Sequence, residues 1–198
     1  MKSLAKDTAI YGLSSIIGKF LNYLLVPLYT YALARTADYG IVTNIYAWTA
    51  LLLVLLTYGM ETGFFRFANR EDYDARTVYK TAYIALLISS ALFTMLIIIF
   101  HQPVANVLGY PDHAEFVEMM FATVAIDAFA CIPFAYLRYQ KRPIVFAALK
   151  LLFVLLNIGF NLLFLVILGK NDVFYVFLSN ILATTIQTLC LLPMTMPK

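Results

Sequence analysis

Three ionisable side chains stand out within long apolar segments of this sequence: Lys19, Glu61 and Asp127. An ionised group near the centre of a bilayer costs about 2.5–3.5 kcal/mol on insertion scales, so such groups usually face a partner or a hydrated cavity. Counted at about 1.5 Å per helical residue, Lys19 and Glu61 lie at similar depths in their segments. They can therefore meet if these two segments are neighbours. We therefore predict a Lys19–Glu61 pair. Asp127 lies near the middle of its segment, where it is expected either to join a structural ion pair or to serve as a proton or cation site.

Polar residues recur at helical spacing in three of the apolar segments. They are Tyr11, Ser15, Lys19 and Asn22 in the first, Lys150, Asn157 and Asn161 in the fifth, and Asn180, Thr184, Gln187 and Thr188 in the sixth. Polar stripes on several helices favour a shared hydrated space. The alternative is that they form interhelical hydrogen bonds that only hold a bundle together.

The segments that must position these groups are long enough to cross a membrane. Of the 198 residues 63% are hydrophobic and 13% are charged, against about 45–50% and about 25% in soluble domains. Six continuous apolar segments reach the roughly 20 residues that a spanning helix needs: 8–33, 41–65, 80–100, 116–137, 143–168 and 173–193. The sequence therefore predicts an all-α integral membrane protein, with residues 1–198 forming a single transmembrane domain, a six-helix bundle.

The distribution of basic residues predicts the orientation. Of the 14 Lys and Arg residues, 11 fall on the side of the two termini, 2 fall on the opposite side, and Lys19 lies within a segment. Positive charge is retained on the cytoplasmic side, so both termini are expected in the cytoplasm. The basic residues are dispersed, which argues against a nucleic-acid partner.

The cysteines and two glycines are predicted to have structural roles. Cys131 and Cys190 lie in apolar segments and are predicted to be small buried hydrophobes without metal or disulfide spacing. Gly59 and Gly63 form a G-x-x-x-G pattern, which predicts close helix packing inside a continuous second helix, with Glu61 on the opposite side. Catalytic motifs such as H-E-x-x-H, a P-loop or G-x-S-x-G are absent from the sequence, so we expect neither an enzyme nor a cofactor.

Four stretches resemble a known family of transporters. They are "TAIYGLSSIIGKFLNYLLVPLYTYALARTADYGIV", "YGMETGFFRFAN", "VLGYPDH" and "IDAFACIPFAYLRYQKRPIVFAALK". Their succession is similar to bacterial polysaccharide-biosynthesis membrane proteins, the O-antigen oligosaccharide flippases of the multidrug/oligosaccharidyl-lipid/polysaccharide exporter superfamily. The resemblance implies that this chain is the N-terminal lobe of a two-lobe transporter. Its partner would be a C-terminal lobe or a second copy of the chain.

The resemblance also implies a function and a set of cavity residues. The expected function is alternating-access transport of undecaprenyl-diphosphate-linked oligosaccharide across the bacterial cytoplasmic membrane, for surface polysaccharide and lipopolysaccharide biosynthesis. The diphosphate would meet Lys19, or Arg66, Arg138 and Lys150, although positive-inside anchoring also explains the last three. Glu61 and Asp127 would serve a coupling proton or sodium ion. The full set expected at the substrate cavity is Lys19, Asn22, Glu61, Arg66, Asp127, Arg138, Lys150 and Asn157.

Two other functions stay open at this point. One is a cation-coupled multidrug antiporter of the same superfamily, although a cavity for cationic drugs should be acidic on balance. The other is a non-transporting membrane scaffold subunit.

Overall fold

The computed structural model describes the backbone of residues 2–195, and within that range all side chains except those of residues 2–8, 15, 17–22 and 36. The helices are α1 (Lys2–Ala32), α2 (Thr36–Thr57), α3 (Met60–Ala68), α4 (Ala75–Leu108), α5 (Ala114–Tyr139), α6 (Pro143–Asn161) with its π-helical extension η1 (Leu162–Ile167), and α7 (Val173–Thr195). The described backbone contains no strand. The predicted all-α class is confirmed.

Five helical stretches are long and apolar enough to cross a membrane. They are Ala37–Ala68, Ala75–Leu108, Ala114–Tyr139, Pro143–Ile167 and Val173–Thr195. They correspond to five of the six predicted segments, and α4 is longer at both ends than its predicted segment. The first predicted segment, 8–33, falls on α1, where many side chains lie outside the described set. A sixth membrane span therefore stays a prediction.

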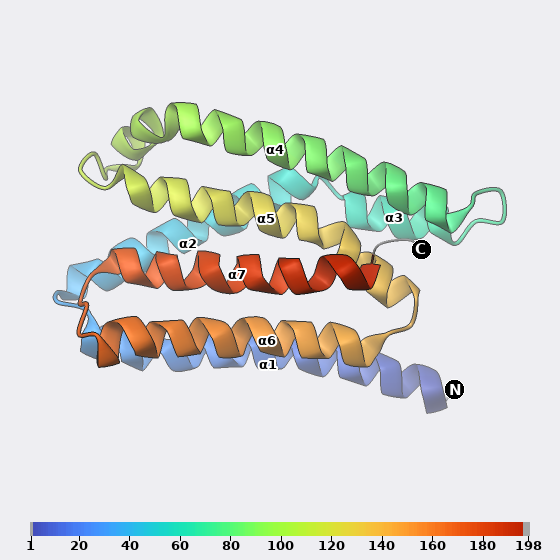
Figure 1. Cartoon of the computed structure of the whole chain (residues 1–198), viewed down its shortest axis with the longest axis horizontal. Coiled ribbons are helices and arrows are strands. Elements are labelled where there is room, and N and C mark those ends of the chain that lie inside the picture. Colours follow the sequence, from blue (N-terminus) through green and yellow to red (C-terminus); the bar gives the residue numbers. More distant parts are fainter. Residues whose placement is uncertain (1, 196–198) are drawn as a thin grey trace.

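The helices lie side by side along the long axis of the molecule (Figure 1). The start of α1 and the end of α7 lie at one end of the bundle, together with the α3–α4 and α5–α6 connections. The α1–α2, α4–α5 and α6–α7 connections lie at the other end. Consecutive helices therefore alternate in direction, except that α2 and α3 run one after the other through the same layer.

The interior of the bundle is centred on α5 and α7. Val117, Ala128 and Leu137 of α5 and Phe177 and Ala183 of α7 have no exposed surface. Helices α2, α4 and α6 surround this centre and expose large aliphatic side chains on their outer faces, as expected where lipid rather than water is the solvent. The helix α1 packs along α6, and α2 packs mainly on α5. α1 also meets α2 near their connection, where Leu25, Tyr29 and Val42 belong to one buried cluster.

The second predicted segment is not one continuous helix. α2 ends at Thr57 and α3 begins at Met60, because Tyr58 (φ 34°, ψ 41°) and Gly59 (φ 69°, ψ 14°) adopt left-handed backbone angles. Glycine accepts such angles without a steric penalty. Among the described residues, nothing beyond the local backbone lies within 4 Å of where a Cβ on Gly59 or Gly63 would stand. The predicted G-x-x-x-G packing seam is therefore wrong for this bundle, since Gly59 serves the helix break.

Candidate functional site

A cavity of about 470 Å³ between α2–α3, α5, α6 and α7 gathers four charged side chains of the described part of the bundle. We call it the charged cavity. Its polar lining is Thr57 from α2, Glu61 from α3, Asp127, Cys131 and Arg138 from α5, Lys150 from α6 and Gln187 from α7. The α5 residues project from one side of that helix because intervals of four and seven residues correspond to about one and two turns. The break at Tyr58–Gly59 places Glu61 in the first turn of α3, where the helix dipole favours an acid.

Glu61 is held by two groups of α5. Arg138 Nη2 donates a hydrogen bond to Glu61 Oε1, and the Cys131 thiol lies 3.5 Å from Oε2 and donates to it. The side chain of Glu61 is 40% exposed and that of Arg138 is 31% exposed, so the pair is only partly withdrawn from its surroundings. The guanidinium carbon of Arg138 also lies 5.3 Å from the ring centre of Phe65. Ionic and cation–π attraction therefore both orient Arg138.

Lys150 approaches the same cavity from α6. Its Nζ atom lies 3.9 Å from the ring centre of Phe134 and 5.9 Å from that of Phe146. Asp127 and Glu61 are the two acids in the described lining of the same cavity. In the described part of the chain, no carboxylate oxygen comes within the 4.0 Å of a salt bridge to Lys150. Its ammonium group therefore rests on aromatic faces, with an acid nearby but not in direct contact.

Four of the eight expected cavity residues meet in the charged cavity: Glu61, Asp127, Arg138 and Lys150. Arg66 lies exposed in the last turn of α3 and is not part of that lining. Asn157 is buried and lines a second cavity. The side chains of Lys19 and Asn22 lie outside the described residues, so the Lys19–Glu61 pair stays a prediction.

Two residues of the charged cavity were missed or misassigned from the sequence. Cys131, predicted to be a buried hydrophobe, is partly exposed and donates to Glu61. Its position four residues after Asp127 and seven before Arg138 was the available signal. Gln187, recognised only as part of a stripe, donates from Nε2 to the Leu149 carbonyl at 2.9 Å and so joins α7 to α6. This is the interhelical bonding that was considered as the alternative for the stripes.

Comparison with known proteins gave one family. The family model for "Polysaccharide biosynthesis protein" matches residues 4–196, nearly the whole chain. No curated protein and no solved structure gave a match.

Proposed function

The chain belongs to the polysaccharide biosynthesis protein family, and from this premise we propose that it forms one lobe of a flippase for lipid-linked oligosaccharide. The observation that carries the proposal is the charged cavity, where Arg138 and Lys150 line one space within a largely apolar bundle. An undecaprenyl-diphosphate carrier has its negative charge between a polyprenyl tail and a glycan. Inside the membrane this charge needs cationic groups of the protein, because the lipid chains supply none.

The charged cavity holds two cations and two acids among its described residues, so it is balanced before a substrate arrives. A diphosphate would compete with Glu61 for Arg138, whose guanidinium can bind two phosphate oxygens at once. Lys150 needs no salt bridge to be broken before it can act as the second contact. Glu61 and Asp127 would then lose their cations, which favours uptake of a proton or sodium ion. Substrate binding and ion binding would thereby be linked through the same four groups.

The chemistry of the two cations, rather than the even charge balance, supports a phosphate-containing cargo. A cavity for cationic drugs should have an excess of acids, which the described lining does not have. A diphosphate finds both cations already placed. The flippase proposal therefore fits this cavity better than a multidrug antiporter does.

The proposed orientation places the charged cavity in the cytoplasmic half of the membrane. The start of α1, the end of α7 and the connections after α3 and α5 share one end of the bundle, and most of the basic residues lie on that side. Arg138 stands in the last turn of α5, next to that end. The diphosphate would enter there, and rocking against a second lobe would open the path to the other side.

The proposal can be tested by lipid binding. The chain is purified in nanodiscs and titrated with undecaprenyl diphosphate and, in parallel, with uncharged undecaprenol. We expect Lys150→Met to weaken diphosphate binding about tenfold, the effect of losing one charge-assisted contact, and to leave undecaprenol binding unchanged. Lys80→Met is the matched control, because Lys80 is an exposed lysine near the same end of the bundle.

Equal affinity of wild type and Lys150→Met for undecaprenyl diphosphate would refute the proposed role of the charged cavity. Equal losses in Lys150→Met and Lys80→Met would also refute it, since they would show only general attraction to a basic surface. In cells, the gene carrying Lys150→Met should fail to restore surface polysaccharide in a flippase-deficient strain that the unaltered gene rescues.

A further inference from the structure

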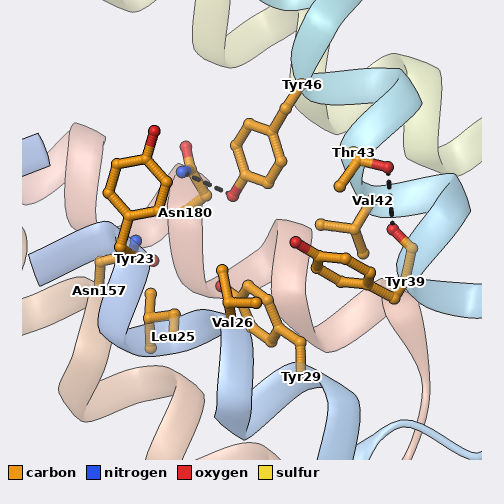
Figure 2. Close-up of a pocket in the computed structure, with 10 residues that line it drawn as sticks. All are labelled: Tyr23, Leu25, Val26, Tyr29, Tyr39, Val42, Thr43, Tyr46, Asn157 and Asn180. Carbon is orange, nitrogen blue, oxygen red and sulfur yellow. Dashed lines mark hydrogen bonds between the residues drawn. The ribbon is translucent and has the colours of Figure 1, made fainter. Parts of the chain in front are cut away.

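A second cavity of about 310 Å³ lies between α1, α2, α6 and α7. We call it the tyrosine pocket. Its chemistry comes from six residues: Tyr23 and Tyr29 of α1, Tyr39 and Tyr46 of α2, Asn157 of α6 and Asn180 of α7 (Figure 2). None of the ten described residues that line it is charged at neutral pH. It therefore differs in kind from the charged cavity.

The two asparagines give the tyrosine pocket buried hydrogen-bonding groups. Asn180 is 7% exposed and Asn157 is 2% exposed. Asn180 Nδ2 donates to the Tyr46 hydroxyl at 3.0 Å, and Asn157 Oδ1 accepts from Asn161 Nδ2 at 3.1 Å. Because an amide has two N–H donors and a carbonyl with two lone pairs, each asparagine retains further hydrogen-bonding capacity. In Figure 2 the Tyr46–Asn180 contact spans the space between α2 and α7.

This combination selects a class of ligand. Tyrosine rings present flat apolar faces with a hydroxyl at the edge, and the amides accept and donate in a site that carries no charge among its described residues. A prenyl or acyl chain would leave the buried amides unmatched, which is unfavourable. A phosphate or a cation would meet no opposite charge among the described lining residues. A sugar ring satisfies both requirements, with C–H faces against the aromatic rings and hydroxyls toward the amides.

The tyrosine pocket lies one step along the bundle from the charged cavity. On α6, Asn157 follows Lys150 by seven residues, and on α7, Asn180 precedes Gln187 by seven. Seven helical residues correspond to about 10 Å along the axis. Both cavities lie between α2 on one side and α6 with α7 on the other. This spacing would match a ligand whose anionic end and neutral end lie about 10 Å apart.

We propose that the tyrosine pocket binds sugar rings of the transported oligosaccharide while the diphosphate occupies the charged cavity. The identity of the complete ligand rests on the proposed function, but the affinity of the pocket for neutral sugar does not. The pocket would serve as a glycan-sensing site on the path toward the far side of the membrane.

The test separates the sugar contribution from the lipid and diphosphate contributions. The full chain in nanodiscs is titrated with undecaprenyl diphosphate, with the same lipid carrying an oligosaccharide, and with the free oligosaccharide. The variants are Tyr39→Leu, which removes one aromatic face at a partly buried position, and Tyr46→Phe, which keeps the ring and removes the hydroxyl bonded to Asn180. Tyr31→Leu is the matched control, since Tyr31 is a tyrosine of α1 that is 89% exposed.

Wild type should bind the glycosylated lipid about tenfold more tightly than the sugar-free lipid, and Tyr39→Leu should remove most of that difference. Tyr46→Phe should weaken free-oligosaccharide binding by a smaller factor, and Tyr31→Leu should behave as wild type. An equal loss for both lipids in Tyr39→Leu would overturn the proposal, because the pocket would then serve the lipid or the fold. No dependence of free-oligosaccharide binding on either pocket variant would also overturn it. Failure to bind undecaprenyl diphosphate, with sugar binding retained, would refute the proposed function alone.

Discussion

The ion pair between Glu61 and Arg138 gives the sharpest test of how this bundle is held together. The perturbation is a double-mutant cycle of Glu61→Gln, Arg138→Met and the combined variant. Each single change removes the ionic contact between α3 and α5, while the double change also removes the charge that either partner leaves behind. The difference between the double variant and the sum of the singles isolates the coupling.

The expected magnitude follows from the geometry. Two unit charges about 4 Å apart attract by about 4 kcal/mol at an effective dielectric constant of about 20. About a third of each side chain remains exposed, so screening and the cost of desolvation cancel much of that attraction. Arg138 also has its Nε atom buried without a hydrogen-bond partner among the described residues. We therefore expect a coupling free energy of about 1–2 kcal/mol, between that of an exposed pair and that of a buried one.

The assay is reversible unfolding of the chain in mixed micelles, followed by circular dichroism at low and high salt. The coupling should shrink only moderately with salt, because a partly enclosed pair is screened less than a surface pair. Arg138→Met should cost more than Glu61→Gln, since it also removes the contact with the Phe65 ring. A coupling near zero would refute the inference that this pair fixes α3 against α5.

Two further predictions concern backbone and capping. Gly59→Ala should destabilise the chain by about 1–2 kcal/mol because φ is 69° there. Gly63→Ala, at a helical position with open space beside it, should be neutral or stabilising by up to about 1 kcal/mol. A larger loss of stability for Gly63→Ala than for Gly59→Ala in thermal unfolding would restore the packing-seam hypothesis. Asp74 caps α4, and hydrogen bonds from the hydroxyl and backbone of Thr77 hold the pKa of its carboxyl below the usual 3.8. A carboxyl whose pKa is lower in the folded state adds stability above its unfolded-state pKa. That stability is lost as the pH falls through its folded-state pKa. Asp74→Ala should therefore lower the melting temperature at neutral pH and converge with wild type in acid below about pH 4, and parallel melting curves across that range would contradict the capping role.

The sequence predicted the helical class and six membrane spans, five of which match helices long and apolar enough to cross a membrane, because these features depend on local properties. A run of about 20 apolar residues must satisfy its backbone hydrogen bonds within itself when lipid surrounds it, whatever its neighbours are. The same local logic identified Lys19, Glu61 and Asp127 as unusual, since the cost of an ion in lipid depends on its depth. It failed at Gly59, because a glycine used for close packing and a glycine used for a left-handed turn have the same local pattern.

The pairing of the charges was beyond the sequence for a physical reason. Depth along a helix can be counted from residue numbers, but which helices are neighbours depends on how all their faces pack. Glu61 was expected to meet Lys19 because their segments are consecutive and similar in depth. The bundle packs α1 along α6 and brings α5 against α3, so Arg138 and Cys131 are the groups that reach Glu61 among the described residues.

By itself, then, the sequence determined that this is an all-helical integral membrane protein with acids and bases inside its apolar segments. Those features follow from composition and from the 1.5 Å rise per residue of a helix. Tertiary structure alone decided that four of the charges share one cavity and that Glu61 has Arg138 as a partner. It also decided that Asn157 lies about 10 Å further along α6, in a pocket whose described lining carries no charge. The reason is that a cavity belongs to several helices at once, and its lining depends on the packing angles and neighbours that no single segment encodes.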